Sequence, residues 1–232
     1  MHIPYSDNKN QALFEENNKT VPLVYFNIVR LNKGESYSYQ LPKHESSVVP
    51  ATGMIELSVD GKILGQIGTR KSDVWDGEPE GSYIPTNAEC IIKCLSDNTE
   101  FFIAGGIYEK KLEPFLVHKN EIDVVQYGSD DTKTHRKIKH ILGAKQHEQV
   151  GRLLVNDCTP LALEGGQAFR HINMIQIIYQ MRLVMMKFII IVLNLVMVLV
   201  FKSCNMKMTK RVSVINCLTV QPLQLIKDII LA

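Results

Sequence analysis

Histidine and carboxylate side chains are the first candidates for chemistry in this chain of 232 residues. His135, His140 and His147 lie in one polar, basic segment, but their spacings match no common pair of metal ligands. No acid completes a cluster with them, so we interpret them as solvated side chains of a connector. The adjacent His44 and Glu45 could serve as an acid and a base, but a single pair at a strand end is a weak signal.

Other chemically suggestive segments also have simpler structural explanations. Asp76, Glu78 and Glu80 lie between glycines and a proline in WDGEPEG, which predicts a solvated loop. Gly105 and Gly106 lack the strand–loop–helix context of a phosphate-binding loop, and we predict a bend or bulge there. No Ser-His-Asp or Cys-His arrangement follows from residue positions. The residues alone therefore identify no catalytic, cofactor-binding or metal-binding side chain.

The elements that would position such residues are strands. From Val21 onward, short β-rich runs alternate with turn signals, and Asp60-Gly61 fits a tight hairpin turn. Because no apolar stripe has a helical period, the pattern predicts an all-β fold, an antiparallel sandwich or barrel. Residues 129–147 are polar and basic and predict a connector, after which VGRLLVND begins another strand.

Bulk composition excludes some partners. A net charge of +2 without a basic, aromatic-interleaved patch argues against nucleic-acid binding. The N-terminal segment MHIPYSDNKNQALFEENNKT is polar and lacks the apolar core of a secretory signal, so we expect a cytoplasmic protein with reduced thiols. Cys90 and Cys94 are too close along an extended run to form a disulfide easily.

The composition changes near residue 157. Before it lie 21 of the 24 acids and 12 of the 14 glycines, whereas the remainder has seven of the nine methionines, eight Lys or Arg residues and three acids. A folded surface mixes both signs of charge, and turns need glycine. The last third of the chain therefore follows different compositional rules from the first two thirds.

Three segments before this change resemble a known enzyme family. GQIGTRKSDVWDGEPEGSYIPTN, SDNTEFFIAGG and HRKIKHILGAKQHEQVGRLLVND, in this order, resemble the 5-deoxy-glucuronate isomerases of bacterial myo-inositol breakdown, which have the cupin fold. The likeness covers about residues 21–156. Its most specific parts are Gly68-Thr69-Arg70, Trp75, YIP at 83–85 and VGRLLV at 150–155.

The resemblance implies a jelly-roll bicupin that converts the aldose 5-deoxy-glucuronate into the ketose 2-deoxy-5-keto-gluconate. We expect a first cupin at 1–113, a connector with the first strand of a second cupin at 114–156, and no reliable domain at 157–232. The family implies a small sugar acid as partner and a divalent metal in the second cupin, held by an HxH pair, a glutamate and a distant histidine. No HxH occurs in this chain, so we expect it to bind no metal.

A lost nucleotide explains both the missing ligands and the changed composition. If the codon after Asn156 lacks one base, every later residue is translated out of register, and polar codons are converted into Ile and Met codons. Shifting the frame back forces an aspartate at Met174-Ile175. It also permits the family's PPHKHD segment, the glutamate and the distant histidine in one frame and in order. We therefore predict that 157–232 is an out-of-frame tail.

The apolar run in this tail allows other interpretations. Leu183 to Phe201 is 19 residues long, close to the ~20 that span a bilayer, and Lys202 could flank a membrane anchor. Lys187 and Asn194 interrupt the run, and it is unusually rich in methionine. The alternatives are a non-enzymatic β-domain with a C-terminal transmembrane anchor, a core helix, or a single cupin in residues 1–156 that binds a uronate without metal.

Overall fold

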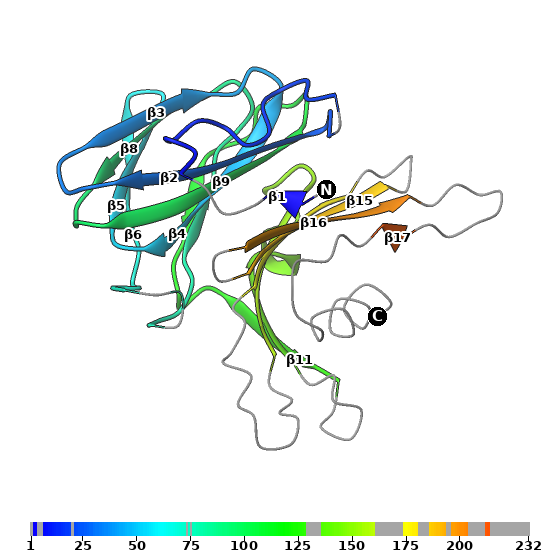
Figure 1. Cartoon of the computed structure of the whole chain (residues 1–232). Helices are drawn as coiled ribbons and strands as arrows, with labels where there is room; N and C mark the ends of the chain where they lie inside the picture. Colours follow the sequence, from blue (N-terminus) through cyan, green and yellow to red (C-terminus); the bar gives the residue numbers. More distant parts are fainter. Residues whose placement is uncertain are drawn as a thin grey trace. The chain divides into compact units, whose positions relative to one another are not determined.

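A computed structural model describes residues 2–3, 7–19, 21–72, 74, 76–128, 136–160, 174–180, 186–193, 196–203 and 212–213 of the chain. Strands dominate the described residues, as the turn spacing predicted (Figure 1). The chain divides into two compact units. One comprises Ser6–Asp123 and His140–Val155, here called the main unit, and the other comprises Met1–Tyr5, Val124–Lys139 and Asn156–Ala232. The domain boundaries expected at 113 and 156 remain predictions.

The main unit contains two larger antiparallel sheets. The first has the order β2-β9-β4 and consists of β2 (Val24–Leu31), β9 (Thr99–Ile107) and β4 (His44–Thr52). The second has the order β3-β8-β5-β6 and consists of β3 (Ser36–Gln40), β8 (Glu89–Cys94), β5 (Ile55–Val59) and β6 (Lys62–Ile67). A third, smaller sheet pairs β7 (Gly81–Tyr83) with β10 (Phe115–Val117).

The hydrophobic core consists of side chains from both larger sheets. Val29 of β2, Ile103 of β9 and Leu57 of β5 belong to one buried cluster and have no exposed surface. Along β8 and β5, buried residues alternate with more exposed ones, because successive strand side chains point to opposite faces. Strand β4 differs, since eight of its nine residues are buried. Both faces of β4 are therefore covered.

Local turn chemistry explains several connections. Asp60 and Gly61 join β5 to β6 with φ values of 49° and 77°, as the predicted two-residue hairpin turn requires. Gly105 corrects an expectation, because it lies within the continuous pairing of β9 with β4 rather than at a bulge. A Cβ atom there would lie 3.0 Å from the Glu45 carbonyl oxygen. The glycine therefore permits close approach of neighbouring backbone.

The remaining strands form a sheet in the order β1-β16-β15-β14-β13-β12-β11, with β17 paired to β16. Their bounds are His2–Ile3 (β1), Asp123–Tyr127 (β11), Arg136–Leu142 (β12), Leu153–Pro160 (β13), Met174–Gln180 (β14), Met186–Leu193 (β15), Val196–Ser203 (β16) and Val212–Ser213 (β17). The strand expected at VGRLLVND is β13. The expected connector at 129–147 instead contains β12 and a short 3₁₀ helix, Ala144–Gln146.

The apolar run at 183–201 adopts strands β15 and β16 wherever the structure describes it. Among the described residues, no helix has the length and apolar character needed to cross a membrane.

Candidate functional site

The carboxylate of Glu45, on β4 of the main unit, accepts four hydrogen bonds. Its Oε1 accepts hydrogen bonds from the backbone amides of Arg152 (2.5 Å) and Leu153 (3.0 Å). Its Oε2 accepts from the Gly151 amide (2.8 Å) and the Tyr83 hydroxyl (2.7 Å). Glu45 has no exposed surface. We call this arrangement of Glu45, Tyr83 and residues 151–153 the carboxylate clamp.

The clamp explains two segments of the family resemblance. Gly151 must lack a side chain, because a Cβ atom there would lie 2.5 Å from Glu45 Oε2 and 2.5 Å from Tyr108 Cδ1. The Tyr83 ring stacks on Phe115 with ring centroids 5.4 Å apart, which fixes the hydroxyl of YIP toward Glu45. YIP and VGRLLV, far apart in the sequence, therefore meet at one carboxylate.

Electrostatics decides what the clamp can do. Burial raises the pKa of Glu45, while the Tyr83 hydroxyl and the three backbone amides oppose that rise. Burial also raises the pKa of Tyr83 well above its usual range, and the neighbouring Glu45 charge adds to the effect. Both oxygens of this fully buried carboxylate each accept two hydrogen bonds, and three of the four donors are the backbone amides of residues 151–153. Glu45 therefore positions residues 151–153 against β4.

His44 points away from Glu45 and has a different partner. Its Nδ1 lies 2.8 Å from Glu16 Oε1, and its side chain is 1% exposed. Burial lowers the pKa of His44, and the hydrogen bond to Glu16 opposes this effect. Within the described residues, its Nε2 is buried without a hydrogen-bond partner. The adjacent pair considered from sequence is therefore two separate interactions on opposite faces of β4.

The Gly68-Thr69-Arg70 segment is held by its own loop. The Thr69 hydroxyl donates to the Glu78 carbonyl at 2.7 Å, and Arg70 Nε donates to the Gly77 carbonyl at 3.2 Å. Arg70 is 2% exposed, so its guanidinium is buried within this loop. Trp75 lies outside the described residues. The Gly68-Thr69-Arg70 segment therefore stabilises the loop that it shares with Gly77 and Glu78.

Glu80 corrects the expectation of a wholly solvated acidic loop. Asp76 and Glu78 are exposed as expected, but Glu80 is only 7% exposed. Its carboxylate accepts hydrogen bonds from the Gly68 amide (2.8 Å) and the Lys119 amide (3.1 Å). An acid that follows a proline in a glycine-rich segment has the composition of a loop residue, and only the folded chain shows that remote amides surround it.

The histidines do not form a metal centre in the described residues. His147 is 71% exposed and bonds to the Ala144 carbonyl, His140 is half-buried in β12, and His135 lies outside the described residues. The described residues contain no group of three or more His, Cys, Asp or Glu side chains that could hold a metal ion. They therefore do not fit the divalent metal that the family resemblance implies.

Cys90 and Cys94 are free thiols, as expected from their spacing. Cys90 and Cys94 both point into the core from β8. Burial raises the pKa of Cys90 to about 12, so its thiol stays protonated at neutral pH. Both cysteines serve as small core residues.

A family model described as "KduI/IolB family" matches residues 2–161. The match begins nearly twenty residues before the likeness noticed from motifs and ends close to the change in composition. A comparison with curated proteins gave no match.

Several solved structures have folds similar to that of this chain. An IolB-like protein from Salmonella typhimurium LT2 shares 20% identity and a TM-score of 0.58, over 71% of this chain and 66% of that protein. The chain thus spans just under two thirds of that relative. The cupin domain of Cnp3 from Schizosaccharomyces pombe has 17% identity and a TM-score of 0.31, over 43% of this chain and 64% of that domain. The architecture is an all-β, cupin-type fold, as the resemblance implied.

Replacement of Glu45 by glutamine tests the clamp. Glu45→Gln places an amide NH₂ where an oxygen accepts two hydrogen bonds, and we expect the free energy of unfolding to fall by about 3 kcal/mol. Denaturant unfolding of the full chain measures this loss, and hydrogen exchange should accelerate at the Gly151, Arg152 and Leu153 amides. Glu89→Gln, an exposed substitution on β8, is the matched control. Equal stability of the two variants would contradict the clamp.

The buried His44 predicts a dependence of stability on pH. Because its pKa is lowered in the folded chain, the unfolded chain takes up a proton first as the pH falls below about 6.5. The contribution of His44 to the free energy of unfolding is therefore present above that pH and is lost toward lower pH. Between about pH 7.5 and about pH 5, the free energy of unfolding should depend less steeply on pH in His44→Gln than in the parent. His147→Gln, at an exposed site, should behave as the parent.

Proposed function

The chain belongs to the KduI/IolB family, whose members are isomerases, and from this premise we propose that it is encoded as a 5-deoxy-glucuronate isomerase of myo-inositol breakdown. The proposed reaction converts 5-deoxy-glucuronate, an aldose acid, into 2-deoxy-5-keto-gluconate. The observation that carries the proposal is the ordered set of segments around Gly68, Tyr83 and Gly151 within the family match. The carboxylate clamp supports it, because it gives two of those segments one shared physical role.

The chemistry of the proposed reaction needs groups beyond the described residues. An aldose–ketose isomerisation moves a proton between neighbouring carbons, and a bound divalent metal would polarise the carbonyl and stabilise the enediolate. The described residues offer neither a metal-binding cluster nor a solvent-accessible acid–base pair at the clamp. We therefore propose that this chain, as written, has no isomerase activity.

A frame change after Asn156 reconciles the family with this missing chemistry. The family match stops at residue 161, a few codons past the proposed lost nucleotide. Glycine and acid content fall at the same place, while methionine content rises. Shifting the reading frame of the tail back by one base allows an HxH pair, a glutamate and a distant histidine to be encoded in this order. The metal-binding half of the family would thus still be encoded in the same gene, in the reading frame that precedes the lost nucleotide.

Restoring the reading frame tests the proposal directly. We expect a gene with one nucleotide inserted in the codon after Asn156 to produce a chain that converts 5-deoxy-glucuronate to the ketose. The chain as written should show no turnover above buffer. The measurement is formation of 2-deoxy-5-keto-gluconate by NMR, with equal amounts of both purified proteins. Turnover by the chain as written, or none by a folded restored chain, would refute the proposal.

Metal content provides a separate prediction. The restored chain should hold about one divalent metal ion per chain after dialysis, because the HxH pair, the glutamate and the distant histidine of its second cupin would supply one full set of ligands. The chain as written should hold none, as measured by mass spectrometry of the metal. A restored chain whose two HxH histidines are replaced by glutamine is the control. Metal bound equally by all three proteins would contradict the assignment of ligands to the restored frame.

A further inference from the structure

The outer edge of β2, where the first sheet ends, is covered by the chain's own N-terminal segment. Strand β2 is the terminal strand in the order β2-β9-β4, so one side of it has no strand partner within the described sheets. Phe14 forms an isolated antiparallel bridge with Phe26 of β2 and continues the sheet for one residue. Its amide donates to the Phe26 carbonyl at 3.1 Å, and its carbonyl accepts from the Phe26 amide at 3.0 Å.

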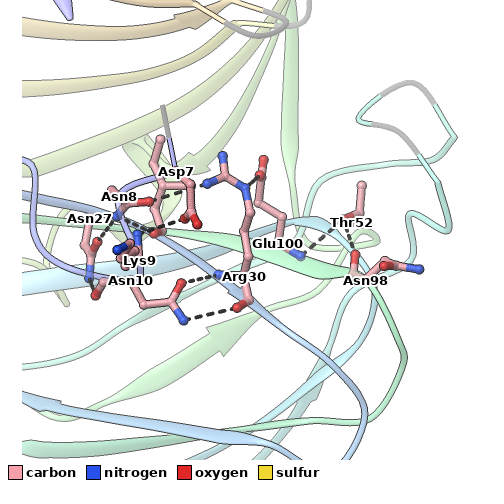
Figure 2. Close-up of polar contacts among 10 residues, drawn as sticks. Asp7, Asn8, Lys9, Asn10, Asn27, Arg30, Thr52, Asn98 and Glu100 are labelled. Atoms are coloured by element: carbon pink, nitrogen blue, oxygen red, sulfur yellow. Dashed lines mark hydrogen bonds and ion pairs between the residues drawn. The ribbon is translucent and has the colours of Figure 1, made fainter. Parts of the chain in front are cut away.

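Further along β2, the side-chain amide of Asn10 forms the hydrogen bonds that a neighbouring strand would form. The Arg30 backbone amide donates to Asn10 Oδ1 at 2.8 Å, and Asn10 Nδ2 donates to the Arg30 carbonyl at 3.1 Å. One asparagine amide therefore bonds both backbone groups of Arg30, as an antiparallel neighbour would. Figure 2 shows this pair of dashed contacts between Asn10 and Arg30.

Asn8 occupies the position between these two contacts. Its Nδ2 lies 2.8 Å from the Ile28 carbonyl oxygen. The same nitrogen lies 3.0 Å from Asn27 Oδ1 (Figure 2). Phe26, Ile28 and Arg30 alternate along β2, so their backbone groups all face the open edge. The N-terminal segment therefore contacts three successive outward positions of the strand.

A left-handed turn holds the two asparagines in this arrangement. Lys9 and Asn10 have φ values of 50° and 60°, and the Gln11 amide donates to the Asn8 carbonyl at 2.9 Å. Asparagine tolerates this conformation better than most residues because its short polar side chain bonds locally. On the inner side, the fully buried Asn27 donates to the Asn10 carbonyl at 3.0 Å and so fixes the turn from within.

We propose that residues 8–14, here called the edge strap, block addition of a strand to β2, and that without the amides of Asn8 and Asn10 this edge binds a second copy of this chain. Exposed strand edges are templates for pairing with another chain, and native folds cover them with loops or charges. The strap is such a cover. A second copy with the same substitutions is the occupant favoured here, because its Ile28 carbonyl and its Arg30 amide and carbonyl would also lack their strap partners. Two such β2 edges complement each other in antiparallel pairing.

The test is the double variant Asn8→Ala with Asn10→Gly in the full chain. Glycine at position 10 keeps the left-handed turn accessible, so the variant removes hydrogen bonds without straining the backbone. We expect the Arg30 amide to exchange with deuterium at least about fivefold faster in dilute protein, as follows from losing one hydrogen bond. In more concentrated samples, light scattering should show a mass increase relative to the parent.

Two further variants separate the edge from general destabilisation. Asn17→Gly also replaces an asparagine at positive φ but lies outside the strap, so its exchange at Arg30 and its mass should equal those of the parent. Asn10→Asp keeps the oxygen that accepts from the Arg30 amide, and that amide should stay protected. Faster exchange with unchanged mass at all concentrations would overturn the proposed second-copy site. Unchanged exchange in the double variant would overturn the strap itself.

Discussion

The buried carboxylate of Glu45 is the constraint on which the arrangement of the main unit depends. Removing a charge from water costs several kcal/mol unless hydrogen bonds replace the lost hydration. Here four donors replace it, and three of them are successive backbone amides more than 100 residues away in the chain. Because those donors are satisfied only when residues 151–153 lie against β4, the charge selects this position over other placements of the segment.

The same physical solution recurs at two other carboxylates. Glu80 joins Gly68 to Lys119 through backbone amides, and Glu16 accepts from the Lys43 amide at 3.3 Å as well as from His44. In each case the carboxylate links segments that are distant in sequence. These three carboxylates stabilise the packing of the main unit by bonding to groups from other segments. The proposed function places the metal chemistry of the family in residues beyond this unit.

What the sequence predicted was local, and what it missed depended on remote partners. The strand pattern of β5 and β8 and the Asp60-Gly61 turn follow from alternation and from conformational preferences of adjacent residues. Glu80 was expected in solvent and β12 was expected to be a connector. Polar and basic residues alone do not show which remote segments will pack against them. Glu45 stood out only as an acid within a strand. Its donors could not be found by spacing, since the fold brings them from the other end of the main unit.

The positions of these stabilising interactions explain how a family fold could persist beside the proposed out-of-frame tail. The core cluster, the carboxylate clamp and the edge strap all lie within residues 8–155, on the N-terminal side of the proposed frame change. Leu153, the last residue of the clamp, precedes Asn156 by only two intervening residues. A frame change after Asn156 would therefore alter none of the side chains that specify the main unit. Selection on packing and hydrogen bonding would remain visible up to that point and vanish beyond it, which is the pattern that the family match and the composition share.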